Sequence, residues 1–445
     1  MRLADALRLE PGRVAAFAGA GGKTSAIRRL ADELAAELPL LITTTTKLAL
    51  AQSSLAPIHV VIQRSHAFPD LMEHLRQNPS VLVTGPQADG QPKWLAPSPA
   101  FMKRLVDLAH EVGAALLIEA DGARGLSLKA PAEHEPAIPR EADLVVPVVG
   151  LDVIGKPLEG RWVQRPERVA RLLGLELGEP TLPESIIRLL TSEEGGLKGA
   201  PPAAEVRVLL NKAESAESEL AGKAIAEAVL DHPRVRAVVI GSVHGDPPIR
   251  WAFGRVAGAV LAAGGSTRLR QSKQLLLWEG KPLVWHAVQA ARKARLSPVV
   301  VVVGADGERI ARAVEGDALI VENPAWEEGQ SSSLRAGLRA AVAGGAEAVV
   351  FLLSDMPHVT EDLVRALVEE HRSTLAPVVA PASQGRRGNP VLFDRVTFAA
   401  LEAVQGDVGG RAVFDRFPVR EVPWDPRAFV DIDTQQDWEN SQTDR

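Results

Sequence analysis

The stretch GAVLAAGGSTRLRQSKQLL, residues 258–276, joins a short apolar segment to a glycine pair and several cations. Gly264 and Gly265 allow a ligand to approach the backbone closely, and the exposed N–H groups of such a loop bind anions. Arg268 and Lys273 would neutralise phosphate oxygens, the first as a planar fork and the second as a point charge. The pattern predicts a triphosphate-binding loop. The alternative is an ordinary strand-to-helix turn with surface cations.

Two aspartates follow apolar segments later in the chain. Asp355 follows the apolar part of AVVFLLSDMPHV, and Asp433 that of AFVDIDTQQDW, and we expect both apolar parts to be strands. Ligands of open α/β sheets bind beyond the carboxyl ends of strands, so both carboxylates would face the site of the glycine loop. Mg²⁺ on a nucleotide needs one or two protein carboxylates, with phosphate and water oxygens as the other ligands. We therefore predict a Mg²⁺ site at Asp355 and Asp433; helix capping is the alternative.

A second glycine loop lies near the start of the chain, in RVAAFAGAGGKTS. It resembles a P-loop, in which Gly21, Gly22 and Lys23 bind phosphate and Thr24 holds Mg²⁺. The first glycine of the usual GxxxxGK[ST] pattern would fall at Phe17, so the fit is incomplete. A simple helix cap is the competing interpretation.

Two further motifs accompany this loop. LLIEADGARG places Glu119 and Asp121 at the end of an apolar segment, where they would complete a Mg²⁺ site. VLLNKAES contains NKAE, which is close to the guanine-recognising NKxD pattern but has Glu214 in place of Asp. A solvent-exposed loop explains NKAE equally well. We expect a purine nucleotide in this half of the chain.

The composition bounds the class of protein. A chain of 445 residues is too long for one hydrophobic core, so two domains are expected. The net charge of −6 argues against a nucleic-acid partner. No apolar run is long enough to span a membrane, and no secretion signal is recognisable. With no cysteine in the chain, we expect a cytoplasmic protein without disulfides or thiolate metal sites.

Short β-branched runs alternate with longer amphipathic, alanine-rich segments throughout the chain. This alternation is typical of α/β domains with mostly parallel sheets. We predict two three-layer α/β/α modules that handle nucleotides, a P-loop-like domain at 1–245 and a Rossmann-like domain at 256–445. The segment VHGDPPIRWAFGRV, rich in Gly and Pro and without sustained periodicity, would mark the boundary.

The second half carries six motifs in order: LAAGGSTRLRQSK, NPAWEEGQSSSLRAGL, LLSDMPHV, RRGNPVLF, GDVGGR and DIDTQQDW. Together they resemble the MobA-like nucleotidyltransferases, and Ala263 in LAAG favours the molybdenum cofactor cytidylyltransferase branch. The resemblance implies transfer of CMP from CTP to the phosphate of the molybdenum–pterin cofactor, with Mg²⁺ and release of pyrophosphate.

The resemblance also assigns residues by their place in the motifs. The triphosphate would contact Gly264, Gly265, Ser266, Arg268 and Lys273; base and ribose would contact Asn323, Ser332 and Ser333; the metal would contact Asp355 and Asp433; and the pterin side would contact Arg387, Gly388, Asn389, Asp407 and Arg411. Arg268, Lys273 and Asp355 are the expected catalytic residues. Arg270 replaces the glycine usual in the family, and arginine is unfavourable if that position needs a positive φ.

The first half resembles the YqeC-type accessory proteins of selenium-dependent hydroxylases, through LITTTTKL, EADGARGLSLKAPAEHEPAIP and VVGLDVIGKPL. This resemblance implies a nucleotide-binding accessory role in the maturation of molybdenum hydroxylases. It makes their apoenzymes or chaperones the expected partners, besides small-molecule substrates.

The sequence thus predicts a cytidylyltransferase of molybdenum cofactor maturation fused to an accessory domain. Two alternatives stay open. One is a non-catalytic carrier that delivers nucleotide-modified cofactor, with Arg270 marking lost turnover. The other is a nucleotidyltransferase that uses GTP, or another acceptor such as a sugar phosphate or a phospholactate-type acid, because acceptor contacts are the part of the site least bound to motifs.

Overall fold

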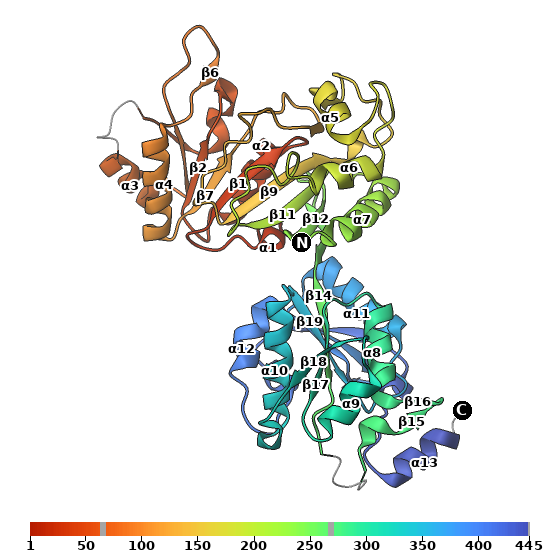
Figure 1. The fold of residues 1–445 in the computed structure, drawn as a ribbon. Helices are drawn as coiled ribbons and strands as arrows, with labels where there is room; N and C mark the ends of the chain where they lie inside the picture. The colour runs from red at the N-terminus through yellow and green to blue at the C-terminus, as the bar shows by residue number, and fades with distance from the viewer. Residues whose placement is uncertain (63–67, 266–270, 444–445) are drawn as a thin grey trace. The chain divides into compact units, whose positions relative to one another are not determined.

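The computed structural model describes residues 1–62, 68–265 and 271–443 (Figure 1). It divides into two compact units, Met1–Phe253 and Gly254–Arg445. Both units are α/β, as the sequence predicts. Across the described ranges, every helix is too short or too polar to traverse a bilayer.

The first unit is built on a nine-stranded sheet in the order β13-β12-β11-β9-β1-β7-β2-β5-β4. Its strands are β1 (Val14–Gly19), β2 (Leu40–Thr44), β4 (Ile58–Val61), β5 (Ser80–Thr84), β7 (Ala115–Glu119), β9 (Leu144–Gly150), β11 (Glu205–Asn211), β12 (Val235–Gly241) and β13 (Ile249–Gly254). The pairs from β12 to β4 are all parallel. Strands covered on both faces need continuous apolar sequence, and β9, LVVPVVG, is buried along its whole length.

Helices and two apolar clusters flank this sheet. The helices are α1 (Leu3–Leu7), α2 (Lys23–Leu34), α3 (Phe68–Gln77), α4 (Pro99–Val112), α5 (Pro166–Leu173), α6 (Pro183–Leu190) and α7 (Ala216–Leu230). One cluster packs the sheet against α4, and the other packs it against α5, α6 and α7. Short pairs are formed by β3 (Leu48–Ala49) with β6 (Lys93–Trp94), and by β8 (Leu128–Lys129) with β10 (Val163–Gln164).

The second unit has a mixed eight-stranded sheet in the order β18-β17-β14-β19-β22-β20-β21, with β23 paired to β20. Its strands are β14 (Val256–Leu261), β17 (Val299–Val303), β18 (Leu319–Glu322), β19 (Ala348–Leu353), β20 (Val378–Ser383), β21 (Arg386–Arg387), β22 (Val391–Asp394) and β23 (Val419–Pro423). The neighbours of β14 on both sides, β17 and β19, run parallel to it. After β14 the chain first adds β17 and β18 on one side and then β19 on the other side, so the strand order reverses at β14. Such a switch point creates a crevice for ligands at the carboxyl ends of the strands.

Helices cover both faces of the second sheet. They are α8 (Leu283–Lys293), α9 (Gly307–Ala313), α10 (Gln330–Ala343), α11 (Glu361–Thr374), α12 (Phe398–Glu402) and α13 (Gln435–Thr443), with a small hairpin of β15 (Leu277–Trp278) and β16 (Lys281–Pro282). One apolar cluster joins the sheet to α8 and α11, and another joins it to α10 and α12 (Figure 1). The result is a three-layer α/β/α arrangement.

Two local expectations were wrong. The segment 243–256, expected to be irregular, contains the edge strand β13. The strand expected before Asp433 is absent, because Val430 is exposed and only Ile432 is fully buried in that stretch. One buried side chain does not give the alternating face that a half-buried strand requires.

Candidate active site

The glycine loop of the second unit begins where β14 ends. Gln274 is buried, and its Nε2 donates hydrogen bonds to the carbonyls of Ala262 at 3.3 Å and Gly264 at 2.8 Å. A β-carbon at Gly264 would meet no atom within 4 Å, so the backbone borders open space into which a ligand can approach. Sequence reasoning overlooked Gln274, since nothing in a single polar residue indicates which carbonyls it holds.

Part of this loop lies outside the described residues. Ser266, Arg268 and Arg270 fall in the range 266–270, so their roles remain predictions. The loop resumes at Gln271 and leads into the 3₁₀-helix η4 (Lys273–Leu275).

Lys273 brings together the two aspartates. Its Nζ donates to Asp355 Oδ2 and, at 2.8 Å, to Asp433 Oδ1, although these residues follow it by 82 and 160 positions. Burial opposes the charge on Lys273, but the two carboxylates outweigh it and raise the pKa of the ammonium above its ordinary value. The lysine therefore stays protonated and neutralises a pair of acids that would otherwise repel each other.

The two oxygens of the Asp355 carboxylate lie in different environments, since only Oδ2 contacts Lys273. Oδ1 is buried and has no hydrogen-bond partner among the described residues. A buried acceptor without a partner is costly, and a cation is one ligand that would satisfy it. In the part of the chain that the structure describes, no group of three or more His, Cys, Asp or Glu side chains is arranged to hold a metal. A metal here would thus use two carboxylates and take its other ligands from substrate and water, which fits Mg²⁺.

Asp433 reaches this cluster on an irregular segment rather than on a strand. The N–H of Ile432 donates to the carbonyl of Asp355 at 3.1 Å, and its side chain packs with Trp278 and Leu283. Trp438 contacts Trp278 edge to face, with ring centroids 6.4 Å apart. These contacts dock the C-terminal segment beside η4.

Asp437 fixes the backbone at Asp433. Its Oδ2 accepts hydrogen bonds from the N–H groups of Asp433 at 3.2 Å and Thr434 at 2.7 Å. The Thr434 hydroxyl caps the N–H of Asp437 in return, at 3.2 Å. This reciprocal cap stabilises the start of α13 and orients the Asp433 carboxylate.

A cavity of about 440 Å³ opens next to the cluster. Its wall includes six of the residues predicted from the sequence: Gly264, Gly265, Lys273, Ser333, Asp355 and Asp407. Ala263, Trp326 and the first residue of α10, Gln330, also line it. The glycine loop, the lysine and Asp355, one of the two aspartates predicted to bind the metal, therefore share one concave site.

Asn323, Ser332 and Ser333, predicted to contact base and ribose, form one hydrogen-bonded group. The Asn323 amide donates to Ser332 Oγ at 2.8 Å and to Ser333 Oγ at 3.0 Å, and all three residues are buried. Its Oδ1 accepts from the N–H of Ala325 at 3.1 Å. Only Ser333 lines the cavity, so Asn323 and Ser332 hold the start of α10 behind the wall.

Of the five residues predicted for the pterin side, only Asp407 belongs to the wall of the 440 Å³ cavity. Asp407 lines the cavity and accepts a 3.2 Å hydrogen bond from the N–H of Gln330. Arg387 instead pairs with Glu421 at 2.7 Å, and Arg411 donates to the Arg387 carbonyl at 3.4 Å. Gly388 lies so close to Phe429 that a β-carbon would stand 2.3 Å from its ring. Asn389 is partly buried and is not part of the cavity wall.

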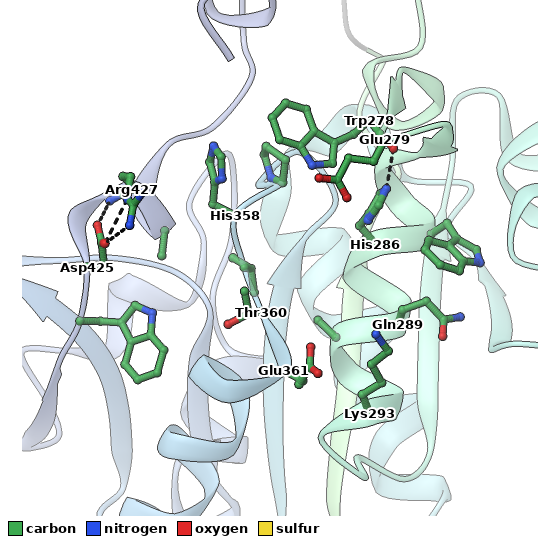
Figure 2. Close-up of a pocket in the computed structure, with 16 residues that line it drawn as sticks. Trp278, Glu279, His286, Gln289, Lys293, His358, Thr360, Glu361, Asp425 and Arg427 are labelled. Carbon is green, nitrogen blue, oxygen red and sulfur yellow. Dashed lines mark hydrogen bonds and ion pairs between the residues drawn. The ribbon is translucent and has the colours of Figure 1, made fainter. Parts of the chain in front are cut away.

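A larger cavity, of about 740 Å³, lies along α8 and the loop that leads into α11 (Figure 2). Trp278, His286 and His358 line this cavity, and the Asp425–Arg427 ion pair forms another part of its wall (Figure 2). The segments after Lys273 and after Asp355 both continue into this wall. Sequence reasoning assigned no site residue here, because its members come from separate elements without a common motif.

The glycine loop of the first unit follows β1 and has a tightly turned backbone. Gly19, Gly21 and Gly22 all have positive φ, and a β-carbon on Gly19 or Gly21 would collide with the backbone of β9. Lys23 Nζ donates to the Gly19 carbonyl at 2.6 Å. Thr24 Oγ1 donates to Glu119 Oε2 at 2.8 Å. Gly19, not the position of Phe17, provides the tight turn of this loop.

Asp121 is held between two buried lysines. Lys23 lies 3.0 Å from Oδ1 and Lys129 lies 2.9 Å from Oδ2, which also accepts from the N–H of Gly19 at 3.1 Å. Burial raises the pKa of neighbouring Glu119, and the charge of Lys23 offsets part of this shift. The structure thus places Asp121 where it orients the lysine of the loop.

Lys129 extends this network to an acid that the sequence did not indicate. It lies 2.9 Å from Glu135, which also forms a two-pronged pair with Arg165 at 2.7 and 3.2 Å. Burial alone would raise the pKa of Glu135, but Arg165 and Lys129 hold it at about 2. Lys129 lies on the two-residue strand β8, which is too short to give a recognisable pattern in the sequence.

Comparison with known proteins agrees with this two-part organisation. A family model described as MobA-like NTP transferase domain matches residues 258–422, and one described as YqeC protein matches residues 15–167. Purine catabolism protein PucB of Bacillus subtilis strain 168 is 31% identical over 169 residues, which cover 35% of this chain and 78% of that protein. Uncharacterized protein YqeC of Escherichia coli K12 is 28% identical over 246 residues, covering 54% of this chain and 91% of that protein.

A solved structure is also similar in sequence. The homolog of Mycobacterium tuberculosis Rv0371c from Mycobacterium sp. strain JC1 is 31% identical, with a TM-score of 0.39, over 43% of this chain and 96% of that one.

The second unit is a nucleotidyltransferase domain, and the protein is therefore a transferase. The chain belongs to the MobA-like NTP transferases, and it carries that domain fused behind a YqeC domain. The predicted fusion of a YqeC domain with a MobA-like NTP transferase domain is confirmed.

Proposed function

We propose that the C-terminal domain transfers CMP from CTP to the terminal phosphate of the molybdenum–pterin cofactor in a Mg²⁺-dependent reaction. Nucleotidyl transfer follows from the family, whereas the nucleotide, the acceptor and the metal are the proposal. The observation that carries it is the convergence of Lys273, Asp355 and Asp433 at the edge of the 440 Å³ cavity.

The chemistry suits the residues at hand. A phosphate monoester is already ionised near neutral pH, so its oxygen can attack the α-phosphorus of CTP without a strong general base. The bond between the α-phosphorus and the bridging oxygen breaks, and pyrophosphate leaves with the bonding electron pair. Lys273 would stabilise the charge on that leaving group, and the glycine loop would orient the phosphates. Asp355 and Asp433 would hold Mg²⁺, which supplies positive charge to the phosphate oxygens when bound.

Two observations support the finer assignment. Ala263, the residue of the LAAG motif that favours the cytidylyltransferase branch, lines the cavity. Asp407, in the GDVGGR motif that contributes to the family resemblance, lies in the same wall. Both agree with CTP and a cofactor acceptor.

For the N-terminal domain we propose a purine nucleotide site that assists modification of the cofactor or its delivery to molybdenum hydroxylase apoenzymes or their chaperones. The positive-φ glycines, the buried Lys23 and the Thr24–Glu119 hydrogen bond support phosphate and Mg²⁺ binding at this loop.

The test is pyrophosphate release by the full chain, with Mg²⁺, purified cofactor and each of CTP, GTP, ATP and UTP. We expect release with CTP, loss of it in Asp355→Ala and normal release in Lys23→Ala. A carrier would give no pyrophosphate above background with any nucleotide. Release with a sugar phosphate but not with the cofactor would overturn the acceptor assignment alone.

A further inference from the structure

Asn211, at the end of β11, joins the phosphate loop of the first unit to the loop after β12. Its Nδ2 donates to the Gly21 carbonyl at 2.7 Å, and its Oδ1 accepts from the N–H of Val243 at 3.0 Å. The side chain is buried, and a β-carbon on Gly22 would come within 2.4 Å of it. Three loops, after β1, β11 and β12, are therefore locked in one arrangement.

These loops lie along one edge of the sheet. β1, β9, β11 and β12 are consecutive parallel neighbours, so their carboxyl ends face the same side (Figure 1). With strands spaced about 4.8 Å apart, β11 lies roughly 10 Å from β1 along this edge. A nucleotide whose phosphates rest on the loop at Lys23 would extend its nucleoside across β9 towards the loops after β11 and β12.

Glu214 lies in the loop after β11, towards which the nucleoside would extend. It is exposed, and its Oε1 accepts a 3.2 Å hydrogen bond from Ser242 Oγ in the loop after β12. The backbone beside it is fixed, because Ala213 N–H donates to the Gly241 carbonyl at 2.9 Å and Ser215 caps α7. Lys212 holds the same loop through Asp152 at 2.9 Å and Ser127 at 2.7 Å.

A fixed carboxylate at this position selects among bases. Guanine presents a ring N–H and an exocyclic amine side by side, and the two oxygens of a carboxylate can accept from both. Adenine presents a ring acceptor there, which would face the carboxylate as an unpaired, repelling group. Sites that demand such a donor pair reject analogues lacking it far more strongly than purely apolar sites do.

We propose that the N-terminal domain binds a guanine nucleotide, with Glu214 recognising the base and Ser242 holding the Glu214 carboxylate in place. This inference rests on the proposed phosphate site at Lys23. It is independent of the transfer reaction assigned to the other domain.

The test measures binding of GDP, ADP and XDP to the full chain with Mg²⁺, by calorimetry. The Lys23→Ala variant supplies the baseline for any diphosphate bound elsewhere. GDP should bind about 10- to 100-fold more tightly than ADP, the discrimination expected of one bidentate base contact. In Glu214→Gln the amide can donate to the 2-carbonyl of xanthine, so the preference should change from GDP to XDP. Glu217→Gln, an exposed acid three positions further on, should retain the wild-type preference.

The gain of XDP binding is a result that misfolding cannot produce. Equal Lys23-dependent affinity for GDP and ADP, or an unchanged preference in Glu214→Gln, would overturn the base assignment while leaving the phosphate site intact. If no diphosphate binds in a Lys23-dependent way, the phosphate site is wrong and the inference falls with it. Pyrophosphate release by the C-terminal domain is unaffected in either case.

Discussion

Lys273 donates a 2.8 Å hydrogen bond to Asp433, a residue 160 positions further along the chain and on a segment outside the sheet. The same ammonium also contacts Asp355, directly after β19. The lysine thus supplies positive charge between two carboxylates, the position that the proposed divalent cation would also occupy. This arrangement predicts competition between the lysine and the metal.

Lys273→Ala should lower the rate of transfer by about 100-fold or more, because it removes a charge aimed at the leaving group. The same variant should bind Mn²⁺ more tightly than wild type in the absence of nucleotide, since both carboxylates are released. Transfer rates together with Mn²⁺ titration by electron paramagnetic resonance measure both effects. Lys293→Ala, an exposed lysine on α8, should change neither, and weaker Mn²⁺ binding in Lys273→Ala would contradict the competition.

Trp438→Ala should undock the C-terminal segment and lower transfer by about tenfold while leaving global stability nearly unchanged. Trp438 is only partly buried, and its contact with Trp278 accounts for about 1 kcal/mol. Steady-state kinetics and urea unfolding give the two numbers, and Trp438→Phe should restore most of the rate. A full-rate Trp438→Ala enzyme would show that the docking of Asp433 is irrelevant to transfer.

Gln274→Met should weaken nucleotide binding by disordering the start of the glycine loop. The substitution keeps the volume but leaves two backbone carbonyls without their donor, at a cost of about 1–3 kcal/mol. Nucleotide titration and urea unfolding report the two effects. The matched control is Gln289→Met, because Gln289 lies on α8 and its side chain donates a hydrogen bond to Asp317 away from the glycine loop. Equal nucleotide affinity in Gln274→Met and wild type would count against this role.

Glu135 should make the N-terminal domain sensitive to acid. Its pKa is lowered to about 2 in the folded protein, so its stabilising effect is complete above the unfolded pKa and is lost as the pH falls towards 2. The full effect corresponds to about 3 kcal/mol. The difference in unfolding free energy between wild type and Glu135→Gln should therefore shrink between pH 6 and pH 3. A difference that stays constant over this range would show that the Arg165 and Lys129 contacts do not depend on its charge.

Residues that follow an apolar strand could be predicted from the sequence. Both glycine loops and Asp355 have that position, and the parallel pairing of β14 and β19 brings the second glycine loop and Asp355 to the same edge of one sheet. Asp433 could be predicted from its motif, but its segment is not a strand. Packing of Ile432 and Trp438, rather than pairing in a sheet, holds Asp433 in place.

The remaining contacts depend on folding in three dimensions. Gln274 and Lys129 each contact partners fixed by other parts of the fold, and neither belongs to a recognisable pattern. Asn323 was predicted to contact the base, and the structure adds two hydrogen bonds from its amide to serines that the motif did not indicate. A sequence shows that such polar residues are present, but it does not indicate with which groups they form hydrogen bonds or ion pairs.

The most direct test of the shared metal site is a crystal structure of the full chain with Mn²⁺ and CTP, read by anomalous scattering. The account predicts one Mn²⁺ peak coordinated by Asp355, by Asp433 and by phosphate oxygens of the nucleotide, with Lys273 moved onto the phosphates. A nucleotide bound in the cavity with Mn²⁺ away from both aspartates, or with Lys273 still between them, would contradict it.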